Sequence, residues 1–181
     1  MKVVIEMEDT LNETVEQVIE EAKEALLDKL RDNPDCETWH CLQDKWTYNG
    51  GDHEVCDSNV PLYTKEIDDL YYLYGEEFEE AYRNAGIGDG SEDNHKMSAI
   101  YCYLQEKMWD GINEWGEELI DAVNERRAEL EDEISELEGQ LEDASDADDE
   151  DLVNRLEAEI DALDVETKMQ EYVDDLSTDS I

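Results

Sequence analysis

Cysteine and histidine side chains gather in one short stretch of the chain, at spacings close to those of a zinc site. Four soft ligands in two close pairs, separated by a β-hairpin, could hold a tetrahedral zinc ion. The first pair is one residue wider than in compact zinc knuckles, and His40 competes as a ligand. We favour the alternative of buried thiols in an aromatic-rich sheet, and we expect no metal and no cofactor. The candidate zinc ligands are Cys36, Cys41, His53 and Cys56.

Acidic residues between positions 146 and 157 partly match the ligand spacing of a calcium-binding EF-hand loop. Asp151 stands where that loop requires a glycine for its sharp turn, and chance matches are expected in so acidic a chain. We therefore expect no calcium site there. The matching residues are Asp146, Asp148, Glu150, Asn154 and Glu157.

Catalysis has little support in the sequence. Paired carboxylates are spread along the whole chain, so none is singled out as a general acid or base. His40, His53 and His95 have no convincing nucleophile partner, and the chain contains no glycine-rich phosphate loop and no nucleophile elbow. We expect a protein that is not an enzyme.

Negative charge is the dominant feature of the composition. The 181 residues include 55 acids and 13 bases, a net charge of −42, whereas solubility requires a magnitude of roughly 2 to 8. Self-repulsion at this charge destabilises a compact fold, so the display of charge is itself a candidate function. Phosphates repel such a surface, so we expect no direct binding to nucleic acid. Proteins that bind nucleic acid are attracted to it.

Carboxylates recur three or four residues apart along the predicted helices, which places neighbouring Cβ atoms about 5–6 Å apart on one face. Rows of this kind hold negative charges at separations close to those of backbone phosphates. An ordinary solvated face would intersperse lysines, and few are present. The alternative is an acidic surface without a specific partner. The candidate partner-binding residues are Asp68, Asp69, Glu76, Glu80, Glu117, Asp121, Glu125, Glu129 and Glu133.

Two acidic helices that fold back on each other are predicted to present the longest of these rows, between residues 117 and 176. Apolar residues there recur at alternating spacings of three and four, which is typical of a coiled-coil seam, and Leu137 lies on that seam. Residues 144–150 are polar and poor in helix formers, so we expect a turn that makes the two helices antiparallel.

A small antiparallel sheet is predicted nearer the N-terminus. Residues 2–7 have the β-branched run of a strand, and the turn Asn49-Gly50-Gly51-Asp52 predicts a β-hairpin over about 45–49 and 53–57. A helix between them ends at Asn33-Pro34, and another is predicted over residues 64–84.

The predicted fold class is therefore α+β and mainly helical. A small sheet with an N-terminal helix is followed by long helices that end in an antiparallel, coiled-coil-like hairpin. The expected parts are a small α+β domain at 1–90, a long helix with the acidic hairpin at 91–176, and a frayed tail at 177–181.

In size, charge and acidic helical build, the whole chain resembles the DNA-mimic proteins of phages and mobile elements. These include anti-restriction proteins and anti-CRISPR inhibitors of Cas nucleases such as Cas9. The resemblance is one of type and has no diagnostic motif, so no functional residue is transferred from it. It implies a partner with a basic DNA-binding cleft, such as a host defence nuclease, whose arginines would bind carboxylates in place of DNA.

Two other functions fit the same charge. One is a halophile-adapted protein of unrelated function, which should need molar salt to fold, and the other is an acidic chaperone for basic proteins. The first residues lack the apolar run of a signal peptide, and no stretch approaches the ~20 apolar residues of a membrane span. We therefore expect the protein in the cytoplasm of a host cell.

Overall fold

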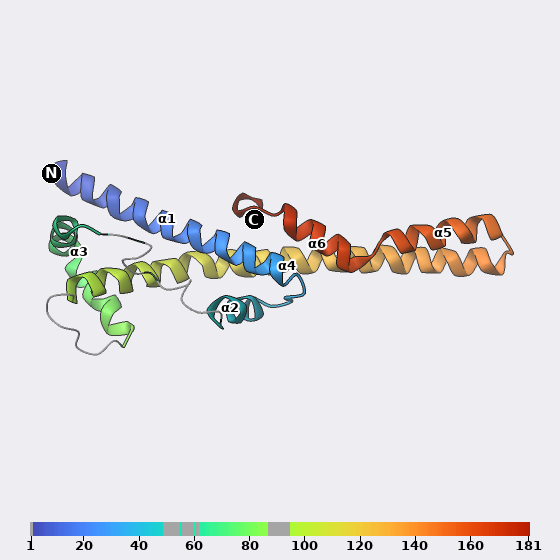
Figure 1. The fold of residues 1–181 in the computed structure, drawn as a ribbon, viewed down its shortest axis with the longest axis horizontal. Helices are drawn as coiled ribbons and strands as arrows, with labels where there is room; N and C mark the ends of the chain where they lie inside the picture. Colours follow the sequence, from blue (N-terminus) through green and yellow to red (C-terminus); the bar gives the residue numbers. More distant parts are fainter. Residues whose placement is uncertain (1, 49–54, 56–59, 61, 87–94) are drawn as a thin grey trace. The chain divides into compact units, whose positions relative to one another are not determined.

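The computed structural model describes residues 2–48, 55, 60, 62–86 and 95–181. Within these ranges all regular structure is helical (Figure 1). The helices are α1 (Lys2–Asp32), α2 (Trp39–Tyr48), α3 (Thr64–Asn84), α4 (His95–Asp146), α5 (Glu150–Ala162), α6 (Val165–Asp175) and the 3-10 helix η1 (Thr178–Ser180).

The chain forms two compact units, which are described separately. The first unit consists of Met1–Leu26 and Asp44–Trp115, and the second of Leu27–Gln43 and Gly116–Ile181. Helices α1 and α4 each contribute residues to both units. The division expected near residue 90 stays a prediction.

The expected antiparallel sheet is wrong, because none of the residues in the described ranges lies in a strand. Residues 2–7 begin helix α1, a helix of 31 residues. Once such a helix has nucleated, each added residue gains a backbone hydrogen bond, which outweighs the modest strand preference of a short β-branched run. The α+β class is therefore corrected to an all-helical fold for the described part of the chain.

The first strand of the expected β-hairpin is also a helix. Residues 45–48 end α2, and the buried side chains Leu42 and Trp46 are four residues apart, a spacing that places both on one helix face. The ring of Trp46 packs edge-on against Trp109 of α4, with 5.4 Å between the ring centroids. The Asn49–Asp52 turn and most of the second strand lie outside the described residues.

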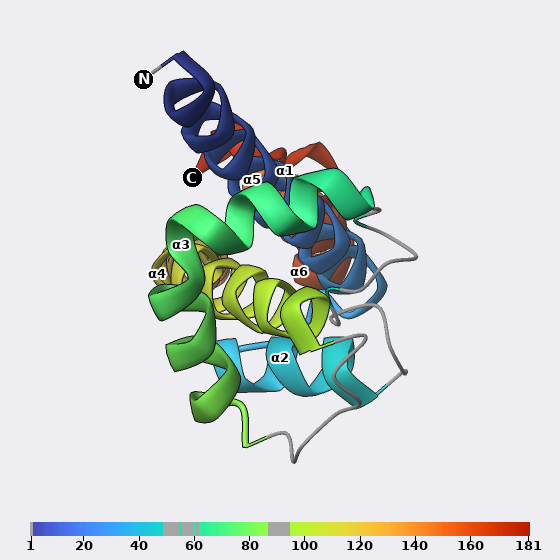
Figure 2. The ribbon, with the colours of Figure 1, turned by 90° about the vertical axis from the view of Figure 1, so that its left-hand side faces the viewer.

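The first unit has a core formed by α1, α3 and α4. Phe78 of α3 is fully buried, and its ring meets that of Tyr103 edge-on at 5.1 Å. The predicted helix over residues 64–84 is confirmed as α3, which bends at Tyr74 (φ −124°, ψ 21°; Figure 2). One row of buried residues of α4 in this unit recurs at every fourth position, on one side of the helix. This row is Ile100, Leu104, Met108 and Ile112, and Ala99, Tyr101 and Trp115 are buried as well.

The second unit contains the predicted antiparallel helical hairpin. Helix α4 ends at Asp146, a turn of three residues follows, and α5 runs back along α4 (Figure 1). Asp148 in this turn has the left-handed backbone conformation (φ 55°), and the Asp149 side chain caps α5 by accepting a hydrogen bond from Leu152 N at 3.2 Å. The turn lies inside the predicted range of residues 144–150.

The return arm of the hairpin is two helices rather than one. Helix α5 ends at Ala162, and α6 begins at Val165. Two side-chain hydrogen bonds join this arm to the end of α1: Gln170 Nε2 donates to Arg31 O at 3.0 Å, and Arg31 Nη2 donates to Leu176 O at 2.7 Å. The second unit is therefore stabilised by hydrogen bonds between the α6 region and the end of α1, as well as by the packing of α5 on α4.

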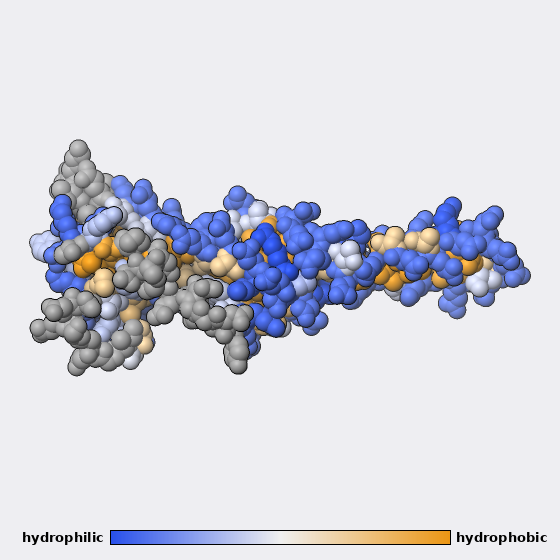
Figure 3. Space-filling model, in the orientation of Figure 1, coloured by the Kyte–Doolittle hydropathy of each residue, from blue (hydrophilic) through white to orange (hydrophobic). Residues whose placement is uncertain are grey.

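The hairpin seam is only partly shielded from solvent. Leu130 and Leu156 are buried, whereas Leu137, Leu141 and Val153 are partly exposed. Figure 3 shows apolar side chains emerging along the hairpin between hydrophilic flanks. Of the helices in the described ranges, none combines the length and apolar character needed to cross a membrane.

Candidate functional site

The acidic residues predicted on α4 are all exposed, and together they form what we call the acidic face: Glu117, Asp121, Glu125, Glu129 and Glu133. The opposite side of the same helix segment is apolar and buried, with Leu119, Val123 and Leu130 at 0% relative exposure. Burial of that side fixes the rotation of the helix about its own axis. The carboxylates are therefore directed to solvent by packing as well as by their own charge.

The acidic face winds around the helix. An α-helix turns by about 100° per residue, so each step of four residues advances about 40° and the five carboxylates sweep about 160° over about 24 Å. The residues predicted as a row thus form a helical stripe across the solvent side of α4. Its first and last members, Glu117 and Glu133, lie near opposite edges of that side.

Two arginines lie beside the acidic face, and both engage residues of the second unit. Arg126 is paired with Glu129 at 2.8 Å, an exposed pair that contributes little to stability. Arg127 donates from Nη2 to Pro34 O at 2.9 Å, and its Nη1 lies 3.6 Å from Glu37. Arg127 therefore anchors the loop between α1 and α2, and its charge is directed away from the acidic face.

The hairpin carries a charge density close to that of duplex DNA. Residues 129–163 hold 16 acids and one base, a net charge of −15. Because α5 doubles back, these charges are spread over the length of α4 from 129 to 146, about 27 Å. The result is one net negative charge per roughly 2 Å, compared with one per about 1.7 Å along the axis of B-DNA.

The acids predicted on α3 are less suited to act as one surface. Asp68 pairs with Lys96 at 2.7 Å, and Asp69 lies 4.0 Å from Lys65. The bend at Tyr74 separates these two residues from the exposed acids further along the same helix. Lysines thus partly neutralise the first two of these acids, and the bend breaks the row. The two exposed acids beyond the bend are Glu76 and Glu80.

The first unit contains a cluster of partly buried polar side chains that was not predicted from the sequence, Tyr71, Glu79 and His95. Glu79 accepts hydrogen bonds from Tyr71 Oη and from His95 Nε2, the latter at 2.7 Å. The hydrogen bond from Tyr71 holds the pKa of Glu79 below its usual value and outweighs partial burial, which acts in the opposite direction. The carboxylate is thus held as an anion. The spacing of these residues in sequence contains no motif that marks them as neighbours.

The structure brings together two of the four candidate zinc ligands. Cys36 Sγ and Cys41 Sγ lie 2.9 Å apart, whereas His53 and Cys56 lie outside the described residues. In the part of the chain that the structure describes, no three Cys, His, Asp or Glu side chains are grouped in a way that would hold a metal ion. The expectation of no zinc stays a prediction.

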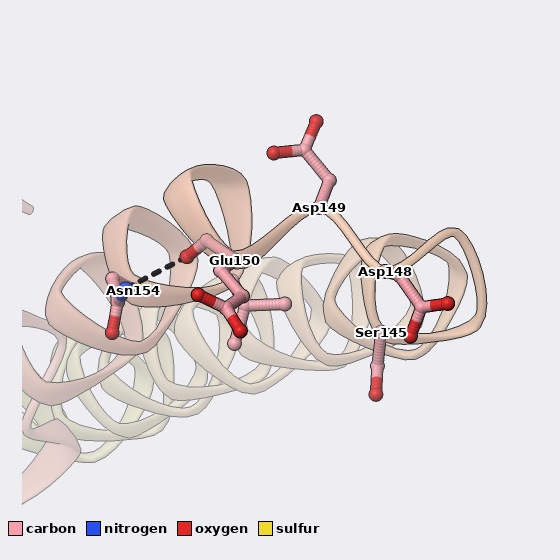
Figure 4. A pocket seen from close by; sticks show the side chains of 6 residues that line it. Ser145, Asp148, Asp149, Glu150 and Asn154 are labelled. Atoms are coloured by element: carbon pink, nitrogen blue, oxygen red, sulfur yellow. Dashed lines mark hydrogen bonds between the residues drawn. The ribbon is translucent and has the colours of Figure 1, made fainter.

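The residues that match an EF-hand pattern do not form an EF-hand loop. The turn contains only residues 147–149, since Asp146 ends α4 and Glu150 begins α5. In Figure 4 the carboxylates of Asp148 and Asp149 point in different directions, and Asn154 Nδ2 donates to Glu150 O at 2.7 Å. The acids at the tip of the hairpin therefore add to its charge without converging on one point.

Comparisons with models of protein families, with curated proteins and with solved structures find no match. The function is therefore inferred from charge, geometry and packing.

Proposed function

We propose that this protein is an acidic DNA mimic that inhibits a host defence nuclease, such as a Cas nuclease or a restriction enzyme, by occupying its DNA-binding cleft. The observation that carries the proposal is the charge density of the hairpin, −15 over a length of about 27 Å. A nuclease cleft is lined by arginines and lysines placed to neutralise phosphates at a similar density.

Carboxylates are suitable partners for those basic residues. Arginine binds a carboxylate through two parallel hydrogen bonds, as it binds a phosphate, and charge-assisted bonds of this kind are about twice as strong as neutral ones. The carboxylates of the acidic face are exposed, and one of the five, Glu129, is joined to a neighbouring arginine. Little rearrangement is therefore needed before they engage a basic cleft.

A helical frame reduces the entropic cost of binding. A disordered acidic tail must be ordered when it binds, which weakens the complex. Here Leu119, Val123 and Leu130 fix the helix that carries the acidic face. A pre-ordered set of charges also favours clefts of matching geometry over basic surfaces in general, and this selectivity separates a mimic from a nonspecific polyanion.

The test compares two variants with the same change of charge. One reverses four members of the acidic face (Glu117→Lys, Asp121→Lys, Glu125→Lys, Glu129→Lys), and the other reverses four exposed acids near the C-terminus (Glu171→Lys, Asp174→Lys, Asp175→Lys, Asp179→Lys). Each variant also loses one exposed ion pair, Arg126–Glu129 or Lys168–Glu171. The C-terminal variant also loses the hydrogen bond that Gln170 Nε2 donates to Asp174 Oδ1 at 2.9 Å. The two variants are matched in charge, exposure and number of lost ion pairs.

Binding is measured by titration against guide-loaded Cas9 and against a restriction endonuclease, at low and at physiological salt. We expect the acidic-face variant to lose far more affinity than the C-terminal variant, and the wild-type affinity to fall as salt rises. Equal, small losses would reduce the interaction to nonspecific electrostatics. Failure of the wild-type protein to bind either nuclease at low salt would exclude both as targets.

A second measurement tests occlusion and covers unknown targets. Proteins captured from a host lysate on the immobilised chain are eluted with short duplex DNA or with polyglutamate of equal total charge. A DNA mimic predicts that duplex DNA elutes the partner far more effectively than polyglutamate. A complex in which the partner holds both this protein and its DNA would contradict occlusion. Folding in dilute buffer, followed by circular dichroism, separates this function from halophilic adaptation.

A further inference from the structure

The sulfur atoms of Cys36 and Cys41 lie closer together than two non-bonded sulfur atoms usually do. Their separation of 2.9 Å is about 0.9 Å longer than a disulfide bond. Both residues are thiols in this structure. Formation of a bond between them therefore needs only a small movement of the two side chains.

Backbone contacts hold both cysteines in place. Cys36 N donates to Asn33 O at 3.1 Å in the loop between α1 and α2. Cys41 lies in the first turn of α2, where its backbone N donates to Thr38 Oγ1 at 3.1 Å. The proximity of the two sulfurs is thus set by the loop and by the start of the helix, and it does not depend on one side-chain rotation alone.

The loop that carries Cys36 is itself fixed to α4. Arg127 Nη2 donates to Pro34 O and Asn124 Nδ2 donates to Glu37 O, each at 2.9 Å. These bonds lie within the second unit, on both sides of Cys36 in the sequence. The pair is therefore part of a loop that is hydrogen-bonded to α4.

The two cysteines differ in accessibility. Cys36 is buried, with 1% relative exposure, whereas Cys41 is partly exposed. A dissolved reagent therefore reaches Cys41 first, and Cys36 is placed to attack whatever forms on it. This division of roles, an accessible thiol beside a resolving one, is typical of redox-responsive cysteine pairs.

We propose that Cys36 and Cys41 form a reversible redox pair that is oxidised by a low-molecular-weight disulfide such as glutathione disulfide. The Cys41 thiolate attacks one sulfur of glutathione disulfide, which forms a mixed disulfide and releases one glutathione thiolate. Cys36 then attacks the Cys41 sulfur, forms the intrachain bond and releases the second glutathione. The two protons of the protein thiols pass to the two glutathione molecules, and reduced glutathione in excess reverses both steps.

The oxidised form would join the loop to the first turn of α2 by a covalent ring from residue 36 to residue 41. Because that loop supplies the carbonyl acceptors of Asn124 and Arg127, the bond would restrict the part of α4 next to Glu125. This inference concerns thiol chemistry alone and does not depend on the proposed DNA mimicry.

The experiment exposes the full-length protein to glutathione buffers of increasing disulfide content, followed by acid quenching and alkylation. Trypsin releases residues 32–45 as one peptide that contains both cysteines. The control is a Cys56→Ser, Cys102→Ser variant, which leaves the pair as the only cysteines in the chain. In both proteins we expect this peptide to become two hydrogen masses lighter, to take up no alkylating reagent, and to return to the dithiol in excess glutathione.

Single variants test the order of attack. Cys36→Ser should accumulate a stable glutathione adduct on Cys41, whereas Cys41→Ser should leave Cys36 reduced because it is buried. Burial raises the pKa of the Cys102 thiol, so that residue should react slowly throughout. The proposal is overturned if the paired peptide of the Cys56→Ser, Cys102→Ser variant stays reduced or carries a stable glutathione adduct. It is equally overturned if the wild-type protein binds one zinc per chain that protects both thiols.

Discussion

Glu79 of α3 accepts a hydrogen bond from Nε2 of His95, the first residue of α4, at 2.7 Å. The same carboxylate oxygen accepts a hydrogen bond from Tyr71 Oη, and the ring of Tyr82 meets the His95 ring edge-on at 4.6 Å. The Glu79 carboxylate thus bridges the bend in α3 through Tyr71 and joins α3 to the start of α4 through His95. Glu79 therefore has a structural role in joining α3 to α4.

The contribution of Glu79 to stability should depend on pH. Its pKa is lowered in the folded protein, so it stabilises the fold above its unfolded-state pKa, and this contribution is lost as the pH falls through the folded-state pKa. Protonation of the other carboxylates relieves repulsion in the same range, so the comparison must be with a variant. We expect the melting temperature of the wild-type protein to be higher than that of Tyr71→Phe at about pH 7. The difference between the two melting temperatures should become smaller toward about pH 3. A difference in melting temperature that does not change with pH would contradict this role of Glu79.

Tyr71 should respond to alkali. Burial, followed by the hydrogen bond to Glu79 and its negative charge, raises the pKa of Tyr71 to about 12. A raised folded-state pKa means that this stabilisation is complete below an unfolded-state pKa of about 10 and is lost as the pH rises toward the folded-state value. Glu79→Gln should lower the pKa of Tyr71, which NMR titration of labelled tyrosine measures directly. An unchanged titration would show that the carboxylate is not its partner.

Substitutions in the seam of the hairpin should lower the free energy of unfolding most at the positions that are most deeply buried. Leu156 is 3% exposed, whereas Leu137 is partly exposed. Leu156→Ala is expected to lower the free energy of unfolding by about 2–4 kcal/mol, and Leu137→Ala by less than half as much. Leu156→Asp should separate α5 from α4, because it buries an unpaired charge. Denaturant unfolding followed by circular dichroism measures these effects, and equal losses at the two positions would contradict the packing.

Two glycines of α4 should respond to alanine in opposite ways. A Cβ at Gly139 would meet no atom within 4 Å, so Gly139→Ala should stabilise the helix by about 0.5–1 kcal/mol. A Cβ at Gly116 would lie 2.5 Å from the ring of Trp39, so the ring must move. Gly116→Ala should therefore lower the melting temperature and change tryptophan fluorescence. Stabilisation by both changes would show that Trp39 is free to move aside.

Zinc should be absent from the protein as purified without a chelator. In the part of the chain that the structure describes, Cys36 and Cys41 are the two candidate ligands that lie together, whereas a stable zinc site needs four. Elemental analysis should find much less than one zinc per chain. If zinc is present and is lost in both Cys36→Ser and Cys56→Ser variants, the prediction of no zinc is wrong and the four-ligand alternative is correct.

Features set by neighbouring residues in the chain were predicted well from the sequence. The bounds of α3 and the turn of the hairpin follow from helical periodicity and from residues that favour or stop helices. The strand over residues 2–7 was predicted from an equally local signal, but these residues form the start of helix α1. Residues 45–48 were misread for a similar reason, because the burial of Trp46 beside Trp109 favours a helix there.

The net charge of the chain is determined by its composition and is independent of the fold. The hydrogen bonds of Glu79 with Tyr71 and His95 depend on the bend in α3 and on where α4 begins, so periodicity contains no information about them. The contact between Cys36 and Cys41 was suggested by spacing as a metal pair, but only the packed loop shows how close the sulfurs lie. Local propensities act over a few residues, whereas the meeting of side chains from different elements is decided by how the helices bury their apolar faces.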